Sequence, residues 1–141
     1  MTVRFFENQR DHALALFRIV VGFLFVCHGA QKIFGVFTAK PPVSLTAWPV
    51  GPAGLIELVG GSLVLIGLAT RWAALLSSGS MAFAYFSVHQ PQALFPIVNQ
   101  GELAAIYSFA FLLIAFTGAG AWSVDRLLSA RKAPHRQTQP A

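Results

Sequence analysis

The residues of this sequence best suited to chemistry are polar and ionisable side chains within, or at the ends of, long apolar runs. An ionisable group is costly inside a membrane helix, so such groups usually face the protein interior, a water-filled cavity or an interface. His28, Gln31 and Lys32 are three and four residues apart, and a helix therefore places all three on one face. Each later apolar run carries at least one further residue of this kind. The full candidate set is His28, Gln31, Lys32, Glu57, His89 and Glu102.

This combination of side chains suits the headgroup of a quinone. The two carbonyl oxygens of a quinone need hydrogen-bond donors, and its redox change takes up protons that His or Glu can relay. We therefore predict a quinone-binding site made by the whole candidate set, in which Glu57 and His28 are catalytic. Two histidines and two carboxylates could also ligate a metal ion. The sequence has no HxxxH or ExxH spacing to support a metal site, and no haem, iron–sulfur or dinucleotide-binding motif.

Several of these residues also have a structural interpretation. Lys32 could extend to the outer headgroups. Glu102 could stabilise the first turn of its helix, and His89 could be a favourable cation at a helix C-terminus. Arg18, in the inner half of the first apolar run, is predicted to be structural, either reaching the inner headgroups or pairing with an aspartate. Glu57 and His28 lie deeper and are harder to explain in this way.

Composition predicts that the elements carrying these residues are membrane helices. The 141 residues are 55% hydrophobic and only 11% charged, and the apolar residues fall into blocks of spanning length. We predict an all-α integral membrane four-helix bundle, one domain over residues 1–130, with a flexible cytoplasmic tail over residues 131–141. The four helices are expected at about residues 12–37, 53–69, 72–88 and 101–119.

The basic residues indicate the orientation of these helices. Lysine and arginine are concentrated before the first apolar run, in the turn between the second and third, and in the tail, while the other side carries only Lys32 and Lys40. The positive-inside rule then places both termini in the cytoplasm, and we expect a bacterial inner membrane protein. Three further apolar runs argue against a cleaved signal peptide at the start. With this topology the candidate residues all fall in the outer third of the bundle, with His28 about 21 Å across a core about 30 Å thick.

Six short motifs occur in a fixed order between residues 13 and 128. They are Leu16-Phe17-Arg18 with Gly22, His28-Gly29-Ala30-Gln31-Lys32, Glu57-Leu58-Val59-Gly60-Gly61, Gly67-Leu68-Ala69-Thr70-Arg71, Asn99-Gln100-Gly101-Glu102-Leu103 with Tyr107, and Gly118-Ala119-Gly120-Ala121-Trp122-Ser123-Val124-Asp125. This ordered set resembles the DoxX family of small four-helix membrane proteins. In that family the last motif usually reads Gly-Pro-Gly, whereas this chain has Ala119 in place of the proline.

The resemblance implies a link to quinone-dependent redox chemistry. The family is named after a subunit associated with quinone-linked oxidation of sulfur compounds, and its members are often described as oxidoreductases. His28, Lys32, Glu57 and Glu102 stand where the family keeps polar residues.

The leading hypothesis is a subunit of a quinone-linked membrane oxidoreductase that acts with a partner protein, because the chain itself carries no redox motif. Whether the chain is itself an enzyme stays open. One alternative is a non-catalytic accessory subunit that packs on a larger membrane complex. Another is a small-molecule carrier, although the sequence shows no inverted repeat or broken helix. The lipid bilayer is an expected partner and nucleic acid is not, since the basic residues lie between and beyond the apolar blocks.

Overall fold

A computed structural model describes residues 2–132 of the chain, with the side chains from Phe6 onwards. Every regular element in this part is a helix, so the predicted all-α class is confirmed for residues 2–132. The elements are α1 (Thr2–Phe34), α2 (Val50–Ile66), α3 (Thr70–Ala84), the π-helical segment η1 (Tyr85–His89), α4 (Pro96–Asn99), α5 (Glu102–Thr117) and α6 (Val124–Lys132).

Helix α1 ends at Phe34 rather than near residue 37, and α2 is Val50–Ile66 rather than about residues 53–69. Larger differences from the predicted helices occur at three places. Helix α1 begins at Thr2 rather than near residue 12, since residues 2–11 contain no glycine or proline to interrupt it. The short helix α4 forms within the predicted 89–100 loop and begins with Pro96, a residue favoured in the first turn. Helix α6 follows the last of the four predicted helices and extends two residues into the predicted flexible tail, with Asp125 in its first turn and two cations in its last. Of the predicted flexible tail, residues 133–141 lie outside the described part.

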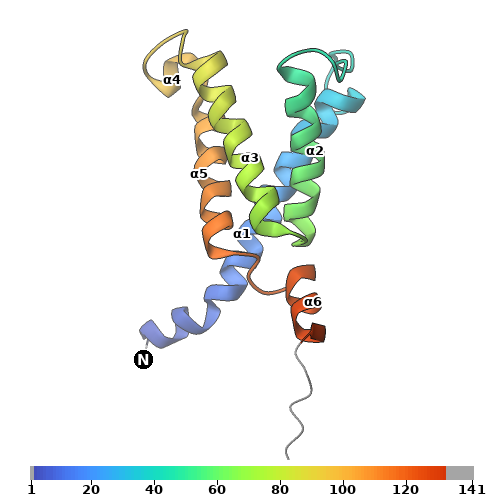
Figure 1. Ribbon diagram of the computed structural model, residues 1–141. Helices are drawn as coiled ribbons and strands as arrows, with labels where there is room; N and C mark the ends of the chain where they lie inside the picture. The colour runs from blue at the N-terminus through green and yellow to red at the C-terminus, as the bar shows by residue number, and fades with distance from the viewer. Residues whose placement is uncertain (1, 133–141) are drawn as a thin grey trace, which may run out of the picture.

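The long helices form two arms that meet at one end and diverge towards the other (Figure 1). Helix α1 packs mainly on α2, and α3 packs mainly on α5. Helices α2 and α3 are joined by a turn over residues 67–69 and separate with distance from it. The start of α1, this turn and α6 lie at one end of the molecule, whereas α4 and the loop between α1 and α2 lie at the other. The divergence opens space between α2 and α3.

Glycines allow α1 and α2 to pack with their backbones nearly in contact. A Cβ atom placed on Gly29 would lie 2.3 Å from the backbone nitrogen of Leu58, and one on Gly22 would lie 2.7 Å from that of Leu65. Such distances are impossible for any residue with a side chain, and small residues at membrane-helix interfaces have this purpose. The close crossing fixes the register between α1 and α2. It therefore also determines which residues of the two helices face each other between Gly29 and the C-terminal end of α1.

The exterior of the helices suits a bilayer. By length and apolar composition, Phe6–Phe34 within α1 is long enough to cross a membrane, and α2 and α5 are apolar but shorter, with 17 and 16 residues. Large apolar side chains on every long helix are exposed, including Phe23, Leu76, Phe109 and Phe116. The buried core is smaller and centres on Phe25, Val64, Phe111 and Ile114.

Candidate functional site

Lys32 of α1 and Glu57 of α2 form an ion pair close to the α1–α2 crossing, on the side of the C-terminal end of α1. Lys32 Nζ donates a hydrogen bond to Glu57 Oε1. Glu57 is only 2% exposed, while the Lys32 side chain keeps 30% of its surface accessible. The pair forms because Gly29 and Leu58 are in contact. Lys32 lies about one helical turn after Gly29 and Glu57 directly precedes Leu58, so this contact brings the two side chains together. Lys32 therefore points into the protein, and the alternative in which it extends to the headgroups is wrong.

The second carboxylate oxygen of Glu57 has no hydrogen-bond partner within residues 2–132. Oε2 is buried, while Oε1 is taken by the lysine. Buried polar atoms in proteins are nearly always paired, so an unpaired one calls for an explanation such as a functional role or a bound ligand or water. The cavity that Glu57 lines suggests such an explanation.

A cavity of about 190 Å³ lies next to the ion pair, among α1, α2, α3, η1 and α5. We call it the polar cavity. Phe25, Met81 and other apolar side chains form part of its wall. The polar residues of the wall are His28, Lys32, Glu57, His89, Gln100 and Tyr107. Tyr107 also contacts the His28 ring edge to face, with 5.9 Å between ring centroids.

A larger apolar groove of about 640 Å³ lies between α2 and α3. These are the two helices that diverge in Figure 1. Trp72, Leu75 and Leu76 line it on α3, and Ile56 lines it on α2. At the end away from the α2–α3 turn, Trp48 meets Phe83 of α3 with 5.9 Å between ring centroids. Lys32, Glu57 and His89 line both the groove and the polar cavity. The two spaces therefore share one polar wall.

The π-helical segment η1 directs His89 towards this wall. Its backbone bond runs from Gln90 N–H to the carbonyl of Tyr85, five residues earlier. His89 Nδ1 lies 3.0 Å from the backbone carbonyl of Asn99. A carbonyl can only accept, so Nδ1 carries the proton and, in the neutral ring, Nε2 is a hydrogen-bond acceptor.

Two predicted site residues lie elsewhere. Glu102 is exposed in the first turn of α5, where a carboxylate interacts favourably with the helix dipole. Gln31 is half-buried and lines neither space. Tyr107 was not predicted as a site residue, although its spacing from the buried Ala104 and Phe111 indicates that it lies on the inner face of its helix.

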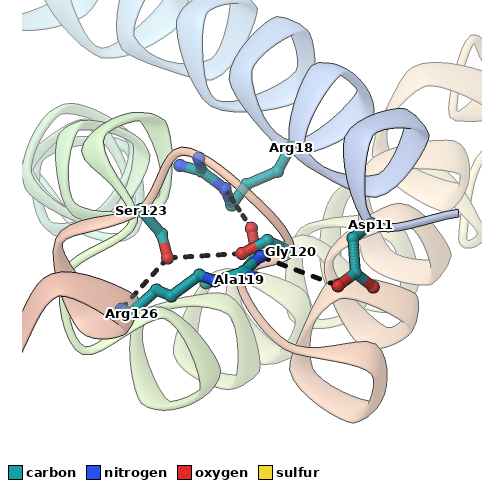
Figure 2. Close-up of polar contacts among 6 residues, drawn as sticks. All are labelled: Asp11, Arg18, Ala119, Gly120, Ser123 and Arg126. Atoms are coloured by element: carbon teal, nitrogen blue, oxygen red, sulfur yellow. Dashed lines mark hydrogen bonds and ion pairs between the residues drawn. The ribbon is translucent and has the colours of Figure 1, made fainter. Parts of the chain in front are cut away.

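Arg18 forms a second buried polar centre, shown close up in Figure 2, where the end of α2 meets the segment before α6. Its side chain is completely buried, and within residues 2–132 its hydrogen bonds all go to backbone carbonyls. Nε donates to Ala119 at 2.8 Å, and Nη2 donates to Trp122 at 3.0 Å. Nη1 donates to the carbonyls of Val64 and Leu65, at 2.5 and 2.6 Å. Arg18 thus ties the end of α2 to the segment before α6.

The hydrogen-bond partners of Arg18 therefore differ from the predicted ones. The buried side chain hydrogen-bonds to neither Asp11 nor Asp125, although its charge acts on Asp125. Figure 2 shows Asp11 facing Arg126 instead, at 3.7 Å. Nearby, Ser123 Oγ accepts from the backbone N–H of Arg126 and so begins α6.

Asp125 caps the start of α3. Its two carboxylate oxygens accept from the backbone N–H groups of Ala69 and Thr70, at 2.8 and 2.9 Å. Burial by itself would raise the pKa of Asp125, but the hydrogen bonds from Thr70 and Ala69 and the positive charge of Arg18 outweigh it, and the pKa lies below its ordinary value. The carboxylate form therefore contributes to the stability of this end.

The sequence pattern of the DoxX family matches residues 13–90, more than half of the chain. This chain belongs to the DoxX family. The match covers most of α1 and the whole of α2, α3 and η1, the elements that supply Lys32, Glu57 and His89.

Relatives of this DoxX protein cover most of its length. A protein of Haemophilus influenzae, named only as uncharacterized, is 43% identical over 84% of this chain and 92% of its own. The inner membrane protein YqjF of Escherichia coli is 30% identical over 87% of this chain and 97% of its own. A protein of Bacillus subtilis named "Putative oxidoreductase CatD" is 26% identical over 78% of this chain and 82% of its own. Solved structures include no match to this chain. Together with its apolar composition, the family and its inner-membrane relative identify a membrane protein.

Proposed function

We propose that this DoxX protein is the quinone-binding subunit of an inner-membrane oxidoreductase and that a partner protein exchanges electrons with the bound quinone. The observation that carries the proposal is the shared wall between the polar cavity and the apolar groove. A lipid-soluble quinone has the same two parts, a polar headgroup and a long apolar tail. The name of the Bacillus relative points to the same class of reaction.

The shared wall offers hydrogen bonds to a headgroup. The Lys32 ammonium has three donor hydrogens, of which one is directed to Glu57, so others are free to donate to a carbonyl oxygen. His28 and Glu57 are the residues proposed to relay protons, because both line the polar cavity. Tyr107 packs on His28 and holds its ring in place.

The apolar groove would take the tail. Its volume of about 640 Å³ is that of a site for a sizeable small molecule. Its walls are indole rings and aliphatic side chains from Trp72 near the α2–α3 turn to Trp48 near the opposite end. Burial of a flexible isoprenoid chain contributes about 0.8 kcal/mol for each methylene removed from water.

The proposal includes an orientation. We propose a four-helix bundle with both termini in the cytoplasm, since Arg71, Arg126, Arg131 and Lys132 lie at the end that holds the α2–α3 turn and α6. The quinone headgroup would then sit nearer the outer face of the membrane.

Gly79 allows a direct test of the groove. It lines the groove, and a Cβ atom added there would meet nothing within 4 Å. Gly79→Phe should fill the groove, and we expect retention of a long-tailed quinone in purified protein to fall about tenfold, because losing two buried methylenes already costs more than the 1.4 kcal/mol of a tenfold change. Gly79→Ala is the matched control and should retain the quinone. Extraction followed by mass spectrometry measures the bound amount.

A further variant tests the headgroup. His28→Ala should lose quinone-dependent activity in the membrane while still inserting and folding. Equal retention by wild type, Gly79→Phe and His28→Ala would contradict the proposal. If no quinone is retained and a stoichiometric partner chain is recovered, the protein is an accessory subunit of a larger complex.

A further inference from the structure

We infer that the site takes the reduced, hydroxyl-bearing form of its ligand in preference to the oxidised form, because Glu57 Oε2 accepts a hydrogen bond from a quinol hydroxyl. This inference rests on the proposed function and adds to it the redox form that the protein recognises. It concerns binding alone and includes no electron transfer.

The first observation is the unequal use of the two Glu57 oxygens. Lys32 donates to Oε1, while Oε2 is buried without a partner in the described residues. Glu57 lines both the polar cavity and the apolar groove, so a ligand that reaches from one space into the other passes this carboxylate. An ionised carboxylate is only an acceptor, and its best partner is therefore a ligand O–H or N–H group.

The second observation comes from a different element. His89 lines the same two spaces, and its Nδ1–H is committed to the carbonyl of Asn99. Its Nε2 is therefore an acceptor in the neutral ring. The shared wall thus presents two acceptors, from α2 and η1, beside one donor, the Lys32 ammonium.

These groups distinguish the two forms of the ligand. A quinone has only acceptor oxygens, so it can use Lys32 but gives nothing to Glu57 or His89. A quinol hydroxyl can accept from Lys32 through its oxygen and donate its hydrogen to Glu57 Oε2. The contact with Lys32 is common to both forms, and the contact with Glu57 belongs to the quinol alone.

The experiment compares dissociation constants for a short-tailed benzoquinone and its quinol, on purified protein in nanodiscs under anaerobic conditions. We expect the quinol to bind at least about tenfold more tightly, the effect of one hydrogen bond to a charged group. In Glu57→Gln the amide oxygen turns to Lys32 and the NH₂ group replaces Oε2, so an acceptor becomes a donor. The preference should then vanish or reverse in favour of the quinone.

Glu102→Gln is the matched control, since it removes an equal charge from an exposed carboxylate outside both spaces. It should keep the wild-type ratio of the two dissociation constants. A purely structural role of Glu57 would weaken both forms alike and leave the ratio unchanged. Measurable but equal affinities in the wild type would overturn the inference and leave the proposed function standing, whereas no binding of either form would overturn the proposed function.

A ligand series makes the test independent of any variant's folding. The dimethyl ether of the quinol keeps the ring and the oxygen atoms but has no hydrogen to donate. We expect the wild type to bind it about tenfold less tightly than the quinol. Equal affinity for the ether and the quinol would also overturn the inference.

Discussion

Arg18 and Glu57 are both almost fully buried, at 0% and 2% exposure, in helices that pack on each other. The Arg18 guanidinium donates to four backbone carbonyls at 2.5–3.0 Å. Glu57 lines a cavity and has one oxygen paired with Lys32, whereas its other oxygen has no partner among residues 2–132. Each nitrogen of the Arg18 guanidinium has a partner, and this group holds the fold together. Under the proposed function, the unpaired oxygen of Glu57 is instead available to a ligand.

The largest expected effect is on Arg18. Arg18→Met should lower the free energy of unfolding by about 3 kcal/mol or more, because four carbonyls lose a charged donor at once. Denaturant titration of the protein in detergent micelles measures the loss, and Arg18→Lys should recover only part of it since lysine has fewer donors. A loss of unfolding free energy below about 1 kcal/mol would show that Arg18 does not hold the fold together.

Variants of the Lys32–Glu57 pair test whether this pair, unlike Arg18, contributes little to the stability of the fold. Glu57→Leu alone should cost about 1–3 kcal/mol, because it leaves a partly buried ammonium unpaired. The double variant Lys32→Met/Glu57→Leu should be within about 1 kcal/mol of the wild type, since the attraction of a buried pair roughly balances its desolvation. The double variant should also lose quinone binding, because it lacks the Lys32 donor. A double variant less stable than the single one would mean that the pair maintains the fold.

The smallest expected effect belongs to Asp125, at the same end as Arg18. Asp125→Asn should lower the free energy of unfolding by about 1 kcal/mol at pH 7, as for the loss of a helix N-cap. The pKa of Asp125 is depressed in the folded protein, so its contribution is present in full above the unfolded value of about 3.9 and is lost as the pH falls towards the folded value. Melting curves should therefore converge for wild type and variant on acidification. Curves that stay parallel down to the lowest pH would contradict this.

The buried face of α2 could be predicted from the sequence. Glu57, Gly60, Gly61 and Val64 have helical spacing, so their common face is predictable, and all four are buried. The partner of Lys32 could not be predicted, because it depends on the register that Gly29 sets against Leu58. The hydrogen-bond partners of Arg18 could not be predicted for another reason. Its partners are backbone carbonyls, which exist at every residue and leave no mark in the sequence.

Depth and direction are separate properties of a helical residue, as Glu102 illustrates. The sequence gives its distance along α5, but the rotation of α5 is decided by the packing of Phe111 and Ile114 in the core, and this turns Glu102 outwards. The apolar groove could not be predicted from the sequence either. A short turn predicts that α2 and α3 are antiparallel neighbours, yet it does not predict that they diverge.

The π-helical turn at Tyr85–His89 determines the direction of His89. It accommodates one residue more than an α-helical repeat, so His89 takes the direction that the preceding residue would have in an unbroken α-helix. The same residues wound as an unbroken α-helix would place His89 about 100° further around the helix axis and away from the shared wall. In this part of the chain the winding of the backbone, as much as the identity of the residues, determines which side chains meet at the shared wall.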